Sequence, residues 1–234
     1  MKHTLLIKDW LSSFLSLLFP RCCVVCGRPL AKGEECICTV CNINLPRTNY
    51  HLRKDNPVER LFWGQIPLER ATSFFFYEKG SDFRLILHRL KYGGQKEIGA
   101  IMGRYMAAEL LSSNFFQGID VIIPIPLHKK KQQIRGYNQS EWIARGIAVV
   151  TGIPIDTESI LRKKNTETQT RKSVFERRDN VEGIFELQHP ETLAGKHILI
   201  VDDVLTTGST TLACASCLVD VEDIRISILT LAMV

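Results

Sequence analysis

The sequence lacks a hydrophobic run long enough to cross a membrane. The apolar stretch Trp10–Phe19 holds ten residues, whereas a transmembrane helix needs about 20. Asp9 lies at its start, no Ala-x-Ala-like cleavage site follows, and Pro20 comes next, which argues against a signal peptide. Its apolar side chains repeat at helical spacing and predict an amphipathic helix that packs on the rest of the protein: Leu6, Trp10, Phe14, Leu17 and Leu18. We expect a cytoplasmic protein without stable membrane insertion, with membrane-surface attachment as the alternative.

The chain also lacks internal repeats, low-complexity tracts and any evident Ser-His-Asp or Cys-His arrangement for nucleophilic catalysis. Isolated histidines such as His88 therefore fit structural roles. Hydrophobic residues make up 45% and charged residues 24% of the chain, as is usual for a globular protein. Its 234 residues suffice for one large domain or for a medium domain with a small module. A net charge of +5 suits a polyanionic ligand or a nucleic acid and selects neither.

Cysteine, by contrast, is concentrated: six of the eight lie between residues 22 and 41. Four of them form two CxxC pairs separated by eleven residues, namely Cys23, Cys26, Cys38 and Cys41. Four converging thiolates predict a closed, structural zinc site, and zinc can supply the roughly 10–16 kcal/mol that about 40 residues cannot gain by burial alone. Disulfides are the alternative and need an oxidising compartment. Cys22 and Cys36 are spare and can replace a neighbour, whereas Cys214 and Cys217 fit as small core residues.

The most informative stretch of the chain is residues 198–211, and it contains two adjacent acidic residues. Apolar residues 198–201 lead into Asp202 and Asp203, and small hydroxylated residues follow at 206–210. Such an apolar run is typical of a parallel strand buried on both faces, and ligands bind where such strands end. The loop and the helix after it predict a phosphate cradle, beside which the carboxylates are placed to bind sugar hydroxyls or hydrated Mg²⁺. Because adjacent buried carboxylates repel each other, we expect a ligand to bind them; the alternative is a turn without a ligand.

A second loop at the same predicted sheet edge follows the apolar segment Ile119–Ile123. Two prolines within the next three residues fix an unusual backbone path. We expect a phosphate group to meet backbone amides near Pro126, Leu127 and His128, and the guanidinium of Arg135. The lysines at 129–131 fit a solvated surface patch better than individual ligand contacts.

The remaining pattern alternates strands with helices, which predicts an α/β fold with a parallel sheet. Residues 42–70 read as an irregular connection. The expected strands are 71–77, 119–123, 159–161, 197–201 and 224–234, and the expected helices are 82–92, 96–112, 140–150 and 209–218. Residues 162–178 hold seven basic and two acidic residues and predict a mobile loop that folds over a phosphorylated ligand, or else a basic surface loop. Residues 90–94 (LKYGG) fit a hinge or a ligand edge, and physical argument does not choose between these.

The stretch 198–211 resembles the phosphoribosyl pyrophosphate (PRPP) signature of the type I phosphoribosyltransferases. The resemblance implies a Rossmann-like parallel sheet of that type. It also implies that Asp202 and Asp203 hold the ribose hydroxyls, and that the loop after the strand at 119–123 holds pyrophosphate, with Arg135 among the catalytic residues. The residues implied to wrap the 5-phosphate are Thr206, Thr207, Gly208, Ser209 and Thr210. The basic segment 162–178 takes the chain position of that family's flexible hood.

Taken whole, the chain resembles the ComF/GntX family, in which a four-cysteine zinc module precedes a type I phosphoribosyltransferase domain. The matching pieces are the two CxxC pairs, Leu90-Lys91-Tyr92, Pro124-Ile125-Pro126, Arg135–Gln139, Thr168-Gln169, Arg178-Asp179-Asn180 and the stretch 202–211. The resemblance implies three parts: residues 1–50 with the amphipathic helix and the zinc module, a connector over 51–70, and a phosphoribosyltransferase-like domain over 71–234.

By the same resemblance we expect PRPP binding and a link to DNA uptake in competence. The first hypothesis is a Mg²⁺-dependent phosphoribosyltransferase whose acceptor is unknown. The second is a non-catalytic protein that binds PRPP and single-stranded DNA, with a competence helicase or recombination proteins as partners. Purine-salvage relatives carry a carboxylate base where this chain has Thr206, so a base of that kind is not expected. No glutaminase domain or N-terminal nucleophilic cysteine is present, which argues against ammonia release from glutamine.

Overall fold

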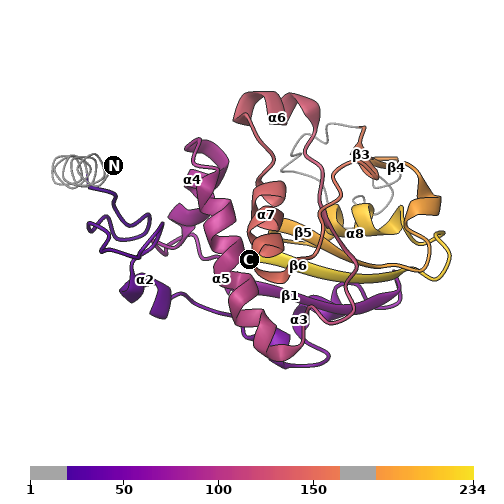
Figure 1. Ribbon diagram of the computed structural model, residues 1–234, viewed down its shortest axis with the longest axis horizontal. Helices are drawn as coiled ribbons and strands as arrows, with labels where there is room; N and C mark the ends of the chain where they lie inside the picture. The colour runs from indigo at the N-terminus through magenta and orange to yellow at the C-terminus, as the bar shows by residue number, and fades with distance from the viewer. Residues whose placement is uncertain (1–19, 164–182) are drawn as a thin grey trace, which may run out of the picture.

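A computed structural model describes residues 20–163 and 183–234 of the chain (Figure 1). The predicted N-terminal amphipathic helix and most of the basic loop, including residues 168–169 and 178–180, lie outside these ranges. None of the helices within the described ranges combines the length and the apolarity that crossing a membrane requires.

A four-stranded parallel sheet forms the centre of the molecule. Its strands, in spatial order, are β1 (Leu68–Phe76), β6 (Arg225–Met233), β5 (His197–Leu205) and β2 (Val121–Pro124). Each neighbouring pair is parallel, and Ile155 adds a parallel bridge to Ile122 beyond β2. The carboxyl ends of the strands therefore meet at one edge, where the register places Pro124 beside Val201. The predicted fold class, α/β with a parallel sheet and a small N-terminal four-cysteine region, is confirmed.

The side chains of β5 alternate between two cores, which explains its unbroken apolar run. Leu199 and Val201 belong to the core shared with α4 (Arg84–Tyr92), α5 (Glu97–Leu110) and α7 (Gln139–Thr151). Ile198 and Ile200 belong to the core on the other face, which includes α8 (Ser209–Ser216). All four side chains are fully buried, as a strand covered on both faces requires.

Two glycines let α5 and α7 approach closely. A Cβ on Gly103 would lie 2.2 Å from the carbonyl oxygen of Ile143, and one on Gly146 would lie 2.1 Å from that of Ala100. Backbone atoms cannot yield to such a contact, so neither position has room for a larger residue. This contact fixes α7 on the sheet, and the N-terminal end of α7 reaches the carboxyl edge.

The four-cysteine region packs on the same core as α5. It contains the short helix α2 (Thr39–Ile43), which lies beside α5 in Figure 1. The Sγ of Cys36 lies 3.9 Å from the Sδ of Met102, and both residues are buried. Arg47 forms an ion pair with Glu109 at 2.5 Å and stacks over Phe74 at 5.4 Å from the ring centroid. Cysteine residues and sheet residues thus share one continuous core.

Several elements differ from those expected from the sequence. Residues 129–135, expected as a lysine patch in a loop, form α6 (Lys129–Arg135), which His128 caps through its side chain. The stretch 42–70, expected to be irregular, contains α3 (Pro57–Arg60) with a capping box from Asn56. Local hydrogen bonds to single polar side chains therefore form helices that hydrophobic periodicity does not reveal. The remaining elements are the antiparallel pair β3 (Ile160–Arg162) and β4 (Phe185–Leu187), and the 3-10 helices η1 (Tyr50–Leu52), η2 (Leu111–Ser113) and η3 (Pro190–Thr192).

Candidate functional site at the carboxyl edge of the sheet

The acidic pair lies near the carboxyl end of β5. The expected strand ended at residue 201, but β5 continues to Leu205 and includes both carboxylates. Ser140 of α7 donates a hydrogen bond from its Oγ to Oδ1 of Asp202 at 2.9 Å. The backbone N–H of Asp203 donates to the same oxygen at 2.8 Å. Lys91, at the end of α4, places its Nζ 3.0 Å from Oδ1 of Asp203.

Lys91 supplies a positive charge beside the acidic pair that the sequence did not predict. From the sequence, the repulsion between the two carboxylates was expected to require a ligand. In the structure a cation from the chain itself neutralises Asp203, so the pair of acids alone does not demand a ligand. The unfavourable effect of bringing the acids together is seen at Asp202. Burial, and then the charge of Asp203, raise the pKa of Asp202 to about 7. The Asp203 N–H, Lys91 and Ser140 act in the opposite direction.

The threonine-rich loop follows β5 and leads into α8. Gly208 adopts a φ of +75°, which glycine tolerates without strain, and it is the residue before the first turn of α8. Ser209 is partly exposed, whereas Thr206, Thr207 and Thr210 are exposed. The hydroxyls of Thr207 and Ser209 lie 2.9 Å apart. Backbone N–H groups and hydroxyls of this loop are therefore accessible to an anion.

Phe62 supports this loop from below. Its side chain is fully buried, and a Cβ added to Gly208 would lie 3.4 Å from the Phe62 ring. Phe62 follows α3, in the stretch that the sequence presented as a connector. The residues between the cysteine region and the sheet therefore contribute directly to the shape of the loop.

The loop after β2 carries the other predicted phosphate contacts. Pro126, Leu127 and His128 are partly exposed. Nδ1 of His128 accepts a hydrogen bond from the N–H of Lys130 at 3.2 Å, so this nitrogen caps α6. Asn138 fixes the loop from the side, because its Nδ2 donates to the carbonyl oxygen of Ile125 at 3.0 Å.

Arg135, predicted as a pyrophosphate ligand, is held in place by two neighbours. Its Nη1 donates to Oε1 of Gln139 at 2.8 Å, and its guanidinium lies 5.4 Å from the ring centroid of Tyr92. Gln139 is 1% exposed, and its Nε2 has no hydrogen-bond partner within the described ranges. A buried donor without a hydrogen-bond partner is energetically unfavourable, so the Gln139 amide is a donor that a ligand beside Arg135 could use.

Among the described residues, four cations lie close to one another, and two of them, Lys91 and Arg162, act on the acidic pair. The pKa of Lys131 is lowered by burial first, and then by the charges of Arg162, Arg135 and Lys91. The positive charge of Arg162 also acts on Asp202, and its guanidinium lies 5.2 Å from the centroid of the Phe185 ring. Lys131 is partly buried, whereas Lys129 and Lys130 are exposed, so the three lysines that the sequence treated alike differ.

A cavity of about 560 Å³ opens beside this group, between the β2 loop, α6 and the β3–β4 pair. Its lining includes Pro126, Leu127, His128, Arg162 and Glu186. The acidic pair and the threonine-rich loop are not part of the lining. The structure therefore places the two predicted phosphate loops at neighbouring positions of one edge, with Arg162 between the cavity and Asp202.

Sequence reasoning missed the residues that join these parts. Lys91 lies in the LKYGG stretch, whose role the sequence left open, and the roles of Ser140 and Arg162 carry no local signal. Tyr137 connects the helices, because its hydroxyl donates to the carbonyl oxygen of Leu90 at 2.6 Å. The hydrogen bonds of Tyr137 with Leu90 and of Ser140 with Asp202 join residues 47 and 62 positions apart, and no sequence spacing reports such pairs.

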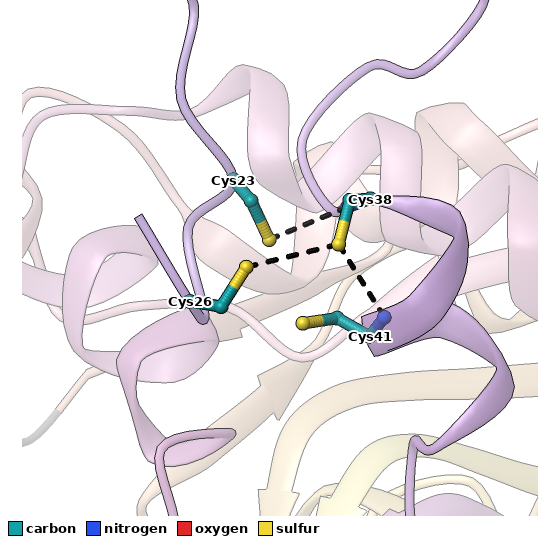
Figure 2. Close-up of side chains that lie close together, drawn as sticks. All are labelled: Cys23, Cys26, Cys38 and Cys41. Atoms are coloured by element: carbon teal, nitrogen blue, oxygen red, sulfur yellow. Dashed lines mark hydrogen bonds between the residues drawn. The ribbon is translucent and has the colours of Figure 1, made fainter. Parts of the chain in front are cut away.

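The four predicted metal ligands come together at a second site (Figure 2). The sulfur atoms of Cys23, Cys26, Cys38 and Cys41 all lie within 4.8 Å of one another, and those of Cys26 and Cys38 are 3.7 Å apart. A tetrahedral zinc site with bonds of about 2.3 Å separates its sulfurs by roughly 3.8 Å, so the spacing fits. The N–H of Cys38 donates to the Cys23 sulfur at 3.3 Å, which suits a thiolate. These cysteines can bind a metal ion, consistent with structural zinc.

The other four cysteines lie apart from this cluster. Burial raises the pKa of Cys36 to about 12, which keeps it a thiol against Met102. Cys22 is exposed and donates to the carbonyl oxygen of Pro20 at 3.4 Å. Cys214 is buried in α8, and Cys217 donates to the Cys214 carbonyl oxygen at 2.9 Å. Cys22 and Cys36 thus do not replace a ligand in this arrangement.

Comparison with known proteins places these features in a context. The chain is 32% identical over 209 residues to the DNA utilization protein YhgH of Escherichia coli O157:H7, covering 83% of this chain and 88% of that protein. It is 31% identical over 130 residues to competence protein F of Haemophilus influenzae, with 54% and 57% covered. It is 26% identical over 216 residues to competence protein ComFC of Bacillus subtilis, with 90% and 83% covered. A scan of family models finds no match.

Among solved structures, phosphoribosyltransferases match this chain at low similarity. An adenine phosphoribosyltransferase from Leishmania tarentolae has a TM-score of 0.38 and 12% identity, covering 81% of this chain and 94% of that chain. A glutamine PRPP amidotransferase from B. subtilis has a TM-score of 0.35 and 20% identity, covering 58% of this chain and 26% of that chain. Family membership rests on the sequence relatives alone.

The fold and the two clusters define a class of protein, an α/β sheet with a pair of acids at its carboxyl edge and an attached cluster of four thiols. Within that class, extended identity with the relatives identifies the family. The chain belongs to the ComF family.

The raised pKa of Asp202 predicts a pH-dependent effect on stability. The carboxyl is ordinarily half-ionised near pH 3.8 but near pH 7 in the folded chain, so the unfolded state loses its proton first. The free energy of unfolding should therefore fall between about pH 4 and pH 7 through this group, and the Asp202→Asn variant should lack that fall. Urea unfolding of both proteins at several pH values measures the difference.

The free energy of unfolding of Asp202→Asn minus that of the wild type should rise from about pH 4 to pH 7 and be constant above and below this range. Asp220→Asn, at an exposed carboxylate just beyond α8, is the matched control and should leave the pH curve unchanged. Curves for the wild type and Asp202→Asn that stay parallel from pH 4 to 8 would contradict the assignment.

Proposed function

We propose that the carboxyl edge of the sheet binds PRPP and transfers its phosphoribosyl group to an acceptor. One observation carries the proposal: the paired acids near the end of β5 are followed by an exposed, hydroxyl-rich loop, and two members of a group of four cations act on them. The loop leads into α8, and the cations are Lys91, Lys131, Arg135 and Arg162, of which Lys91 and Arg162 act on the acids. PRPP has groups to match each of these, with a phosphate at one end, vicinal hydroxyls in the middle and a pyrophosphate at the other end.

The acids and the loop would hold the sugar half of the ligand. Asp202 and Asp203 accept hydrogen bonds, and vicinal hydroxyls are two donors at matching spacing. The N–H groups and hydroxyls of residues 206–210 would bind the 5-phosphate at the start of α8. Phe62 beneath Gly208 keeps this loop from collapsing into the core.

The cations would bind the pyrophosphate and favour its departure. In the transfer, the bond between ribose C1 and a pyrophosphate oxygen breaks, the leaving group takes the electron pair, and the acceptor bonds to C1. Positive charge develops on the sugar and negative charge on the leaving group. Asp202 and Asp203 favour the former, and Lys131, Arg135 and Arg162 the latter. Mg²⁺ would add Lewis-acid stabilisation of the pyrophosphate, held mainly by substrate oxygens.

Thr206 stands at the position where purine-salvage relatives carry a carboxylate base. An acceptor that is already nucleophilic at neutral pH therefore suits this edge. The relatives named for competence and for DNA utilization support a place for this reaction in DNA uptake or the use of imported DNA.

We further propose that the four-cysteine cluster holds structural zinc. The four ligands would close the coordination shell and leave no open position for chemistry. Because Cys36 and Cys38 lie in the core shared with α5, the ion would stabilise the helix layer as well as its own region.

Metal content tests this assignment. The purified wild type should contain one zinc ion per chain by plasma mass spectrometry. Cys38→Ser should lose most of the zinc because three thiolates leave the site open. Cys22→Ser, at an exposed cysteine outside the cluster, should keep it. Equal zinc in both variants would refute the ligand set.

Calorimetric titration with PRPP and Mg²⁺ tests the edge itself. The double variant Asp202→Asn with Asp203→Asn should lose measurable binding, because the amides cannot replace two charged acceptors. Its zinc content should stay equal to that of the wild type, which shows that the fold is intact.

Asp220→Asn is the matched control and should bind as the wild type does. Release of pyrophosphate with a panel of amines and bases then separates catalysis from binding. Unchanged PRPP titration of the double variant would contradict the site, and binding without any pyrophosphate release would leave a PRPP-binding protein rather than an enzyme.

A second function, binding of single-stranded DNA, is favoured by one surface feature. Tyr92 is 69% exposed and carries the Arg135 guanidinium over its ring, and α6, which ends at Arg135, begins with the exposed lysines at 129 and 130. Exposed aromatic rings beside cations are the usual platform on which bases stack while the backbone meets positive charge.

Salt dependence of single-stranded DNA binding measures this second function. Lys129→Ala with Lys130→Ala should reduce the slope of log affinity against log salt by about 1.4, since each phosphate contact contributes roughly 0.7. Tyr92→Ala should weaken binding about tenfold through lost stacking while leaving the slope unchanged. A steep salt slope that neither variant alters would place DNA elsewhere on the protein.

A further inference from the structure

Lys91 forms an ion pair with one of the two acids at the carboxyl edge of the sheet. Its Nζ lies 3.0 Å from Oδ1 of Asp203, and the two side chains are 19% and 11% exposed. The end of α4 that carries it is anchored, because the preceding residue, Leu90, is fully buried and its carbonyl oxygen accepts from the Tyr137 hydroxyl. The lysine head is therefore the movable part of an otherwise fixed arrangement.

A sugar hydroxyl that binds Oδ1 of Asp203 competes with this ammonium group. A partly buried carboxylate and its cation are each costly to leave alone, so a ligand that only separates them loses affinity. A second position for the Lys91 ammonium group lies among the neighbouring cations. The charge of Lys91 acts on Lys131, whose pKa is also lowered by Arg162 and Arg135. An anion that enters among these cations would attract Lys91 away from Asp203.

We propose that Lys91 is an exchangeable counter-ion: it neutralises Asp203 in the free protein and moves to a pyrophosphate oxygen when sugar hydroxyls replace it on Asp203. This inference rests on the proposed function and adds a specificity to it. Lysine suits the role because its ammonium group is compact, carries three donors and sits on a flexible stem.

The exchange makes the two halves of the ligand depend on each other. A sugar phosphate without pyrophosphate must displace Lys91 and offers it no new partner. Pyrophosphate without the sugar draws Lys91 away and leaves Asp203 without a cation or a donor. A ligand that has both halves compensates both groups, so the edge selects for molecules in which hydroxyls and pyrophosphate are joined.

Calorimetry with three probes, each with Mg²⁺, tests the exchange: PRPP, ribose 5-phosphate and inorganic pyrophosphate. In Lys91→Met, pyrophosphate should bind at least about tenfold more weakly, because a charge-assisted hydrogen bond is lost. Ribose 5-phosphate should bind as tightly as to the wild type or more tightly, because no cation has to be displaced. PRPP should be weakened by less than pyrophosphate.

Asp203→Asn should give the reverse pattern, with ribose 5-phosphate weakened and pyrophosphate retained or tightened because Lys91 is released. This variant also keeps the test decisive if Lys91→Met does not fold. Lys32→Met, at an exposed lysine of the cysteine region, is the matched control for lost charge and should change ribose 5-phosphate and pyrophosphate binding by less than about twofold.

Equal weakening of ribose 5-phosphate and pyrophosphate in Lys91→Met would mean that the lysine only supports the fold of the edge. No change with either probe would mean that it takes no part. Both results would overturn the exchange while PRPP binding by the wild type preserved the proposed function. Failure of the wild type to bind any of the three probes would overturn both proposals.

Discussion

Burial of β5 on both faces is the constraint on which the rest of the structure depends. The strand can carry no polar side chain along most of its length without leaving it in a core, so its carboxylates can lie only near the carboxyl end. Parallel pairing then brings the end of β2 to the same edge, and the contact between Gly103 and Gly146 brings the start of α7 there. The site is therefore a consequence of where a buried parallel sheet first meets water.

The cysteine region and the sheet depend on each other through this same core. Cys36 packs on Met102 of α5, and Arg47 joins Glu109 of the same helix. A module of about 40 residues cannot bury enough surface alone, and here its apolar residues complete the layer that covers the sheet. The packing of the cysteine region and the packing of the helices beside the carboxyl edge therefore share one set of contacts.

The sequence predicts those parts of the molecule that local patterns determine. An unbroken apolar run followed by acids locates β5 and its carboxylates, and the spacing of cysteines locates the thiol cluster. It does not predict that β5 includes the acids, because ladder hydrogen bonds rather than apolarity extend the strand to Leu205. It also misses α6 and Lys91: the first depends on a cap from His128, and the second on a contact with Asp203 across more than 100 residues. Pairs of that separation arise only from topology.

The position of Phe62 has a consequence for how this protein can be divided. The ring that lies under the turn at Gly208 comes from a stretch that resembles a tether between two bodies. A shortened protein beginning at the first strand would keep the acids, the threonine-rich loop and the cations, and would lose the ring beneath Gly208. In this chain the stretch that looks like a spacer is a structural support of the loop, so the sheet half depends on residues that precede its first strand.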